Sequence, residues 1–554
     1  SAGCCRSIMW SLLPLFASLL LGGWCARADR YHPANHADRY HPADPAGRVA
    51  AINRAEANAA FWTTEAQVAI DERLKRIESV KKARNVVMFL GDGMSVPTLA
   101  AARTLLGQRQ NATGEESKMY FETFPTVGMA KTYCVNAQIA DSACTATAYL
   151  CGVKTNYGVI GVNANVRRND CGASTDSGTH LRSIAEWALE DGRDAGVVTT
   201  TRITHASPAG VYAKVANRTW EFNAQVEEHG FDTERCPDIA LQLITKHPGN
   251  KLKVILGGGR RNFLPNDVRD EEGSRGSRTD KRNLINEWKQ DKDDRGVTHE
   301  YVWNRDQLMQ ANNSLPDYLL GLFESSHMQY HMESNLETEP TLAEMTEVAI
   351  RSLSRNENGF FLFVEGGRID HAHHDNLVHL SLDETLEMDA AVERAAQMLS
   401  EDDSLIVVTA DHAHVMSFNG YSLRGNDILG PSRDVDDNGM PYMTLSYTNG
   451  PGFRSHVNGI RPNVTAENGA LAWESHVDVP LESETHGGDD VAVFARGPHH
   501  SMFTGLYEQS QLPHLMAYAA CMGPGRHACS SASPAGVPVA FFTIFVLLTS
   551  LFIQ

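Results

Sequence analysis

Four short apolar runs, each followed at once by side chains with oxygen or imidazole donors, constrain the fold of this chain most strongly. The runs read VVMFLGDG, GVVTTTRITHAS, FFLFVEGG and LIVVTADH. Short continuous apolar runs are typical of strands that are buried on both faces of a sheet. The donors that follow these runs are Asp92, His205, Ser207, Glu365, Asp411 and His412.

Helical patterns separate the runs, for example SVPTLAAARTLL after the first and LDETLEMDAAVERAAQML before the last. Alternating strands and helices predict an α/β fold, with a large central and mostly parallel sheet flanked by helices on both faces. In such sheets ligands bind beyond the carboxyl ends of the strands, where Asp92, Glu365 and Asp411 lie. One acid after one strand is more often a capping or loop residue, but three such acids favour a metal site.

The composition is that of a large globular protein, and the charge excludes one class of partner. The chain has 554 residues, 42% of them hydrophobic and 21% charged, so it is long enough for more than one domain. Its formal net charge is -19, which argues against nucleic-acid binding because phosphate backbones require a basic surface. A site for an anionic substrate would therefore have to supply its own local positive charge.

The stretch ADSACTATAYLCG, residues 140–152, consists mostly of small residues and contains Ser142. These residues alone leave two interpretations open. In one, Asp141 or Ser142 caps a closely packed helix. In the other, Ser142 is a nucleophile at a helix N-terminus, where backbone N–H groups meet an anion.

Three further segments contain histidine and carboxylate side chains at spacings that suit a zinc ion. In RIDHAHHDN, Asp370 and His374 are four residues apart, so on a helix they project from one face while the two histidines between them point elsewhere. ADHAH supplies two adjacent ligands at a strand end, with His414 close behind, and ETHGGDD adds His486. Four separate segments with suitable histidine and carboxylate side chains are poorly explained as surface residues without a function.

An all-oxygen set, in contrast, suits Mg²⁺, and Asp92, Ser207 and Glu365 form such a set. Two zinc-like sites, an oxygen-only site and a serine among small residues together indicate phosphoryl transfer. A pair of metal ions stabilises attacking and leaving oxygens together. Metal coordination also lowers the pKa of a hydroxyl, which would activate Ser142 without a neighbouring base.

The N-terminal region resembles a processing signal. After Arg6 the apolar run IMWSLLPLFASLLLGG is followed by CARA, which predicts a secretory signal peptide over residues 1–28. The duplicated DRYHPANHA and DRYHPADPA then form a polar leader over residues 29–50. A flexible leader fits this composition better than a metal-binding tract does.

The C-terminal region carries the small residues SSAS and then the apolar run VPVAFFTIFVLLTSLFIQ. A transmembrane helix is one interpretation. The short run and the lack of a basic segment after it favour a GPI-anchor signal over residues 530–554, with Ser530 or Ser531 as the anchor residue.

A secretory route permits disulfides and glycosylation. Without the signal peptide the chain has an odd number of cysteines, which predicts one free thiol or an intermolecular bridge, and their spacing leaves the connectivity open. These cysteines are Cys134, Cys144, Cys151, Cys171, Cys236, Cys521 and Cys529. The glycosylation sequons are at Asn111, Asn217, Asn312 and Asn463.

With these segments in view, the chain resembles the eukaryotic alkaline phosphatases over nearly its whole mature length. The segments that carry the resemblance are specific as a set. They are VVMFLGDGM, DSACTATAYLCGVKTNYG, VVTTTRITHASPAGVYAKVANRTW, VILGGGRRNF, GFFLFVEGGRIDHAHH, VVTADHAHVMSFNGY and ETHGGDDVAVFARGPHH. The resemblance implies a homodimer, a catalytic domain over residues 51–529 and a small crown-like insertion at about residues 420–484.

The resemblance also implies roles for individual residues. Ser142 corresponds to the nucleophile, which becomes phosphoserine, and Arg218 to the arginine that holds the phosphoryl group, whereas Arg202 does not match that position. His205 and His414 correspond to neighbours of the metal ligands. The implied ligands of two zinc ions and one magnesium ion are Asp370, His374 and His486 for one zinc, Asp92, Asp411 and His412 for the other, and Asp92, Ser207 and Glu365 for magnesium.

The resemblance also implies a calcium site and two disulfides, to which the sequence itself adds a third disulfide and three glycosylated asparagines. The calcium ligands are Phe323 through its carbonyl, Glu324 and Glu339, and the fourth falls on Asp270 or Glu271 in a loop that is shorter than in the family. Family pairing gives Cys171–Cys236 and Cys521–Cys529, whereas Cys144 replaces a small residue of the family and has Cys134 as its expected partner. Cys151 is then left unpaired. Glycosylation is expected at Asn111, Asn312 and Asn463, but not at Asn217, which adjoins Arg218.

We therefore expect a GPI-anchored enzyme on the extracellular face of the cell membrane that hydrolyses a broad range of phosphate monoesters at alkaline pH. Two alternatives remain. A related metal-dependent phosphodiesterase or sulfatase shares the metal-binding carboxylates but usually has a Thr or a modified Cys as its nucleophile. A non-catalytic surface protein of this fold would be expected to have lost a ligand or the serine. The intact ligand set with Ser142 favours the phosphatase.

Overall fold

The structure is a computed structural model that describes residues 81–465 and 470–529. These residues all belong to one compact unit of the chain, Ala50–Gln554. The predicted signal peptide, polar leader and anchor signal lie outside the described residues. Among the helices of the described part, none is long and apolar enough to cross a bilayer.

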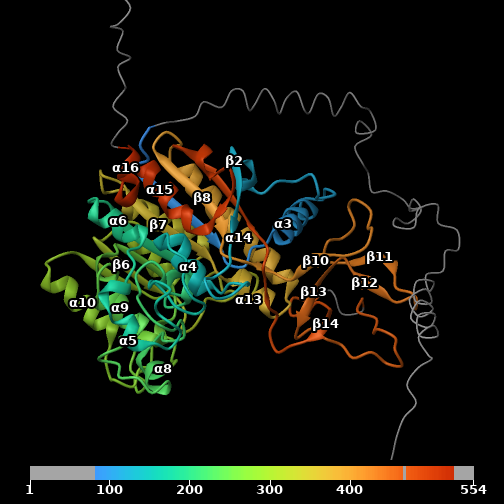
Figure 1. The fold of residues 1–554 in the computed structure, drawn as a ribbon, viewed down its shortest axis with the longest axis horizontal. Helices are drawn as coiled ribbons and strands as arrows, with labels where there is room; N and C mark the ends of the chain where they lie inside the picture. Colours follow the sequence, from blue (N-terminus) through green and yellow to red (C-terminus); the bar gives the residue numbers. More distant parts are fainter. Residues whose placement is uncertain (1–80, 466–469, 530–554) are drawn as a thin grey trace, which may run out of the picture. The chain divides into compact units, whose positions relative to one another are not determined.

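A ten-stranded sheet forms the centre of the described chain (Figure 1). Its strands, in their order across the sheet, are β17 (Gly505–Glu508), β2 (Thr126–Lys131), β16 (Val491–Arg496), β8 (Ser404–Ala410), β1 (Asn85–Gly91), β7 (Phe360–Gly366), β3 (Asp194–Arg202), β4 (Val254–Gly258), β6 (Tyr318–Leu322) and β5 (His299–Val302). Neighbouring strands are parallel except that β16 runs antiparallel to β2 and β8. The predicted mostly parallel sheet is confirmed.

The central strands β1, β7 and β8 are buried along their whole length, as their continuous apolar sequences predict. Their register aligns their carboxyl ends. Gly91 at the end of β1 lies opposite Gly366 of β7 and Ala410 of β8. The residues that follow these positions therefore meet at one edge of the sheet.

Helices cover both faces of the sheet, in two groups whose members contact one another and the strands. One group consists of α3 (Val96–Arg109), α12 (Leu342–Leu353), α13 (Arg368–His374) and α14 (Val378–Met398). The other consists of α4 (Ser142–Cys151), α6 (Ile184–Glu190), α7 (Ala206–Ala209) and α15 (Leu512–Ala520). The remaining helices are α5 (Cys171–Ser174), α8 (Asn223–Glu228), α9 (Ile239–Thr245), α10 (Leu284–Asp294), α11 (Arg305–Ala311) and α16 (Arg526–Cys529).

Small sheets follow β8 in the chain. The strands β10 (Met416–Phe418), β13 (Leu445–Gly450) and β14 (Val477–Pro480) form one of them, and β11 (Pro431–Val435) pairs with β12 (Pro441–Met443). Figure 1 shows these five strands grouped together. They account for the segment at about residues 420–484, whose division into a separate crown-like domain stays a prediction. A last pair joins β9 (Ala413–His414) to β15 (His486–Gly487).

Three disulfides link cysteines of the described chain: Cys134–Cys144, Cys171–Cys236 and Cys521–Cys529. Cys171–Cys236 and Cys521–Cys529 are the pairs that the family resemblance implies, and Cys134–Cys144 is the pair expected from the departure at Cys144. Cys151 is buried and unpaired. Burial raises the pKa of its thiol to about 11, so the group stays protonated and acts as a small apolar side chain.

Candidate active site

The three acids that follow the central strands lie at the same edge of the sheet, as the strand register requires. Asp92 follows β1, Asp411 follows β8 and Glu365 is the penultimate residue of β7. None of the three side chains is exposed to solvent. Burial, followed by the charges of neighbouring carboxylates, raises the pKa of Asp92 well above its ordinary value. The edge therefore concentrates negative charge that has left water.

Helix α13 and strand β15 add a second set of donors beside these acids. Asp370 and His374 project from one face of α13, and Asp370 Oδ1 lies 3.4 Å from His374 Nε2. His486 reaches the same place from β15, where its Nε2 is 3.4 Å from Asp370 Oδ1 and 3.0 Å from His374 Nε2. Residues that are far apart in the sequence thus bring one carboxylate and two imidazoles together.

Backbone carbonyls decide which nitrogen of each imidazole faces this point. His374 Nδ1 donates to the carbonyl of Glu484 at 2.6 Å, and His486 Nδ1 donates to the carbonyl of Ala140 at 2.7 Å. A carbonyl only accepts, so each Nδ1 holds a ring hydrogen, and the tautomer that binds a metal presents the lone pair of Nε2. Two converging lone pairs beside a carboxylate form a suitable donor set for a zinc ion.

His412 occupies the centre of the site. Its Nε2 lies 3.1 Å from Asp411 Oδ2, 3.5 Å from Asp92 Oδ1 and 3.2 Å from Ser142 Oγ. Asp411 is held from behind, because its Oδ1 accepts from the amide of Gly93 at 2.9 Å. The ring therefore lies where two acids and the serine meet.

Asp92, Ser207 and Glu365 form an oxygen-rich neighbour of this centre. Ser207 Oγ donates to Asp92 Oδ2 at 3.3 Å, and Thr201 Oγ1 donates to Glu365 Oε2 at 3.1 Å. Within the described chain, the buried atoms Asp92 Oδ1 and Glu365 Oε1 have no hydrogen-bond donor. Burial raises the pKa of Glu365 to about 7. Buried acceptors without donors are what a cation site of hard oxygen ligands contains.

Three sets of side chains present donor atoms that lie within 4.8 Å of one another, the separation expected of ligands to one ion. Asp92 and Asp370 each belong to two sets, so the sets adjoin. They are Asp370 with His374, His414 and His486; Asp92 with Asp370 and His412; and Asp92 with His205 and Glu365. The donor chemistry fits the two zinc ions and the magnesium ion that the family resemblance implies.

His414 lies within the first set, but its contacts are those of a supporting residue. Its Nε2 is 2.8 Å from Asp370 Oδ1 and its Nδ1 is 2.5 Å from Glu484 Oε2. Burial opposes a charged ring here, yet the Glu484 carboxylate and the hydrogen bonds to both acids raise the pKa of His414 to about 10. Both ring nitrogens face carboxylates, so a protonated ring in this position orients Asp370.

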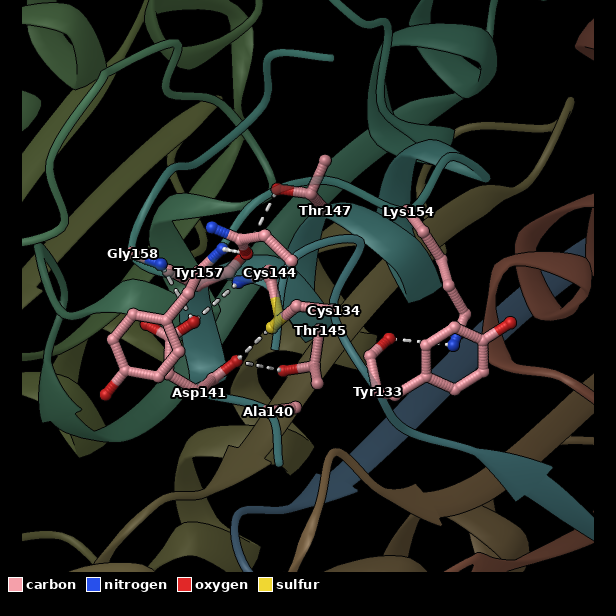
Figure 2. Close-up of a disulfide and its surroundings, with 12 residues drawn as sticks. Tyr133, Cys134, Ala140, Asp141, Cys144, Thr145, Thr147, Lys154, Tyr157 and Gly158 are labelled. Atoms are coloured by element: carbon pink, nitrogen blue, oxygen red, sulfur yellow. Dashed lines mark hydrogen bonds between the residues drawn. A yellow bond between two sulfur atoms is a disulfide. The ribbon is translucent and has the colours of Figure 1, made fainter. Parts of the chain in front are cut away.

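The stretch around Ser142 combines the two interpretations that the sequence left open. Asp141 is the N-cap of α4, and its Oδ1 accepts from the amides of Cys144 at 3.2 Å and Gly158 at 3.0 Å (Figure 2). Ser142 is the first residue of the helix and places its hydroxyl beside His412. The acid is the cap, and the hydroxyl lies at a helix N-terminus suited to an anion.

Arg218 reaches the same place from the loop after α7. Its Nη1 donates to Asp141 Oδ2 at 3.0 Å, and its Nη2 lies 3.4 Å from His205 Nε2. About a fifth of its side chain, 20%, is exposed. Arg202 is engaged elsewhere, because its Nη2 pairs with Glu221 at 2.6 Å. Only one of the two arginines is therefore directed at Ser142.

Two histidines of α13 make contacts outside the metal-binding sets. His373 lies between Thr98 Oγ1 at 3.0 Å and Tyr447 OH at 2.7 Å. His371 Nδ1 accepts from Arg368 at 2.8 Å. Neither belongs to any of the three sets, as the helical spacing indicates.

The residues expected to bind calcium lie close together, but an arginine is among them. Arg260 Nη2 donates to the carbonyl of Phe323 at 3.3 Å, and its Nη1 lies 3.3 Å from Glu271. Burial, followed by contacts with neighbouring acids, leaves the pKa of Glu324 raised and that of Glu339 at about 7. The guanidinium already supplies positive charge at the Phe323 carbonyl, and calcium binding stays a prediction.

The sequence interpretation missed two contributors to the site. It treated Asp141 only as a helix cap, whereas the second carboxylate oxygen also holds Arg218. It did not single out Glu484, which contacts His414 through its side chain and His374 through its carbonyl. The only available signal was its position two residues before His486.

Comparison with known proteins agrees with this geometry. The sequence profile of the alkaline phosphatase family matches residues 83–522. The membrane-bound alkaline phosphatase of Bombyx mori is 64% identical over 531 residues, which are 95% of each chain. The tissue-nonspecific alkaline phosphatase of Gallus gallus is 46% identical over 504 residues, which cover 89% of this chain and 95% of the relative.

The fold has solved counterparts as well. An alkaline phosphatase from the Antarctic bacterium TAB5 superposes with a TM-score of 0.56 at 21% identity, covering 80% of this chain and 99% of the bacterial one. The match of the family profile and of close relatives over most of the chain is decisive. The chain belongs to the alkaline phosphatase family and is an enzyme that hydrolyses phosphate monoesters.

Proposed function

We propose that Ser142 is the nucleophile of the reaction and passes through a phosphoserine intermediate. The observation that carries this proposal is the 3.2 Å distance between Ser142 Oγ and His412 Nε2, at the point where the candidate metal sets adjoin. Ser142 is also the first residue of α4, whose free backbone amides stabilise negative charge. No other hydroxyl of the candidate site described above combines both features.

The metal ligands in this proposal are those that the family resemblance implies, and all of them except Asp411 and Ser207 belong to the three donor sets. One zinc ion is assigned to Asp370, His374 and His486, a second to Asp92, Asp411 and His412, and a magnesium ion to Asp92, Ser207 and Glu365. When bound, such ions lower the pKa of a nearby hydroxyl and neutralise charge on phosphoryl oxygens. The tautomers of His374 and His486 and the acceptors without donors on Asp92 and Glu365 support this assignment.

The chemistry consists of two displacements at phosphorus. Ser142 Oγ attacks the phosphorus atom, the bond to the ester oxygen breaks, and the proton lost from the serine is balanced by the proton that the departing alcohol gains. Water then attacks the phosphoserine, the bond to Oγ breaks, and inorganic phosphate leaves while the hydroxyl is restored. Each step needs the phosphoryl group held in line with the attacking oxygen.

Arg218 provides that hold in our proposal. A planar guanidinium donates two parallel hydrogen bonds to phosphoryl oxygens, which an ammonium group does not reproduce. The contact between Arg218 Nη1 and Asp141 fixes the guanidinium beside the nucleophile, because Asp141 directly precedes Ser142. Positioning and charge stabilisation together must remove about 20 kcal/mol or more of the barrier for an unactivated monoester.

Ser142→Ala is expected to abolish turnover while the metals stay bound. Removal of a nucleophile that acts together with its surroundings lowers kcat by about 10⁴-fold or more. We would measure phosphate release from an aryl phosphate at alkaline pH and metal content by elemental analysis, with the exposed Ser177→Ala as the matched control. Near-normal turnover by Ser142→Ala, with the variant folded, would refute the nucleophile assignment.

Arg218→Lys is expected to lower kcat/KM by about 10-fold to 100-fold, because a charge-assisted hydrogen bond contributes about 1.5–3 kcal/mol and lysine loses the bidentate geometry. Arg202→Lys is the control, since Arg202 pairs with Glu221 rather than with the site. Steady-state kinetics on one substrate compare the two variants. Equal losses in both would contradict a specific role for Arg218.

His374→Gln is expected to remove about one zinc ion per chain, because the Nε2 atom of this ring faces the proposed zinc position beside Asp370. His371→Gln, on the same helix but outside the donor sets, serves as the control and should keep the wild-type metal content. Elemental analysis after dialysis gives the stoichiometry, and activity with and without a chelator shows whether the metal matters. Identical zinc content in both variants would disprove the assignment.

We also propose that the enzyme is a glycosylated homodimer with a GPI anchor on the extracellular face of the membrane. The small residues and apolar run of residues 530–554 support the anchor, and the Bombyx mori relative carries the name of a membrane-bound alkaline phosphatase. Asn111 and Asn463 have exposed side chains suited to glycans. Asn217, in contrast, is buried and donates to Asn169 at 2.6 Å.

The anchor is tested by expressing the full chain in insect cells and treating intact cells with a phosphatidylinositol-specific phospholipase. Release of phosphatase activity into the medium is expected, since the phospholipase cuts a lipid anchor but not a transmembrane peptide. Activity that stays with the cells, while a known GPI-anchored marker is released, would indicate a different attachment.

A further inference from the structure

The Cys134–Cys144 disulfide closes a loop that carries the start of the active site. The two cysteines are 10 residues apart, and the segment just before Cys144 contains Ala140, Asp141 and Ser142. Figure 2 shows the disulfide directly beside Ala140 and Asp141. The loop is therefore tied covalently to the first turn of α4, two residues after the proposed nucleophile.

Three site contacts depend on where this loop lies. The carbonyl of Ala140 accepts from His486 Nδ1 at 2.7 Å and so fixes the ring that faces Asp370. Asp141 Oδ2 accepts from Arg218 Nη1 at 3.0 Å. Ser142 Oγ lies 3.2 Å from His412 Nε2. The positions of His486, Arg218 and Ser142 thus all depend on consecutive residues of one loop.

Apart from the disulfide, the inner half of the loop, residues 138–140, is weakly held. In the described chain no helix or strand lies between Lys131 and Ser142. Residues 138–140 make one hydrogen bond there, the one from His486 to the Ala140 carbonyl. The side chain of Ile139 is 46% exposed. Segments with few buried contacts and few hydrogen bonds open readily in native proteins.

The outer half of the loop is better attached, which shows where the weakness lies. Val135 N donates to the carbonyl of Thr155 at 2.9 Å, and Tyr157 N donates to Asn136 Oδ1 at 2.8 Å. After Ala137 the loop makes its buried apolar contacts within a small cluster of Cys134, Ala140 and Cys144. This cluster is separate from the main core. The disulfide is the centre of that cluster, so the loop packs on the bond itself.

We propose that the Cys134–Cys144 disulfide is a positioning element of the active site, which holds the Ala140 carbonyl against His486 and Asp141 against Arg218. The inference rests on the proposed roles of Ser142 and Arg218. Without the bond, residues 138–141 open more often, and each opening removes the partner that orients a metal ligand and the partner that holds the clamp. The disulfide thus acts through other residues and does not itself touch the substrate.

The test replaces both cysteines with alanine, which removes the bond but keeps small apolar side chains in the cluster. Cys521→Ala/Cys529→Ala is the matched control, because that disulfide spans 8 residues and contacts none of the site residues named above. Both variants are studied as full-length holoenzymes at a temperature where circular dichroism shows them folded. The readouts are the rate of zinc transfer to a chelator and the Kd for inorganic phosphate at saturating zinc.

Cys134→Ala/Cys144→Ala is expected to lose zinc about 10-fold faster or more, the size of effect that loss of a partner behind a metal-binding histidine produces. Its affinity for inorganic phosphate and its kcat/KM should fall in parallel, and the control variant should match wild type in all three. A role in stability alone would lower the unfolding temperature of both variants and leave these readouts unchanged. Wild-type zinc release and phosphate affinity in the folded Cys134→Ala/Cys144→Ala enzyme would overturn the proposal.

Reduction of the wild-type holoenzyme provides a second route if the double variant does not fold. Cys134 is buried, with 3% of its surface exposed, but it lines a surface hollow of about 540 Å³. Tris(2-carboxyethyl)phosphine, which does not sequester zinc as a dithiol does, converts the disulfide into two thiols and is itself oxidised to the phosphine oxide, with the oxygen taken from water. Alkylation and mass spectrometry then show which bridge has opened. Loss of phosphate affinity in step with Cys134 alkylation, restored on reoxidation, supports the proposal, and unchanged affinity overturns it.

Ser142→Ala, measured alongside, separates this proposal from the proposed function. If Ser142→Ala remains active, the nucleophile assignment fails. The zinc-release and phosphate-binding readouts still report on the disulfide, because neither requires turnover.

Discussion

Burial of negative charge is the constraint on which the rest of this structure depends. Asp92, Glu365, Asp370 and Asp411 are all buried where β1, β7, β8 and α13 meet. Buried carboxylates raise one another's pKa, and an unpaired buried charge costs about several kcal/mol. The imidazolium of His414 compensates Asp370, but Asp92 and Glu365 keep oxygens without donors in the described chain. The strand register therefore brings together acids whose buried charge must be offset, by protonation or by bound cations.

Backbone carbonyls link this charge balance to loops far from the sheet. His374 and His486 present bare nitrogens to the site because the carbonyls of Glu484 and Ala140 accept their other ring hydrogens. Glu484 adds its side chain to His414 and to the amide of Val415, so one residue supports two imidazoles and a strand end. The donors are thus oriented by segments on both sides of the site, the loop before α4 and the segment after β14. Movement of either segment would disturb the metal ligands before it disturbed the sheet.

The sequence predicted the parts of this molecule that follow from local patterns. Continuous apolar runs identified the buried strands, and the residues after them identified the ligand edge, because parallel strands end on the same side. The four-residue spacing of Asp370 and His374 gave their shared helix face. Contacts between distant segments carried no such pattern. Tertiary packing alone brings Arg218 to donate to Asp141 and Arg260 to donate to the Phe323 carbonyl. In the same way, a short polar stretch such as ESETHGG does not reveal that Glu484 is buried.

An acidic protein that acts on an anion must separate its overall charge from the charge at its site. With a formal net charge of -19 the chain repels phosphate esters at long range, but salt screens such repulsion over about 8 Å at physiological ionic strength. Close to Ser142, the guanidinium of Arg218 and the N-terminus of α4 favour an anion. Burial, followed by the charge of Arg218, lowers the pKa of His205 well below its ordinary value, so the ring stays neutral and does not compete with the guanidinium for the same anion. Asp141 occupies only Nη1 of Arg218, and the rest of the fork keeps donors for phosphoryl oxygens. Under the proposed assignments, the free donors of Arg218 beside Ser142 therefore favour the orientation of the substrate in which Ser142 can attack.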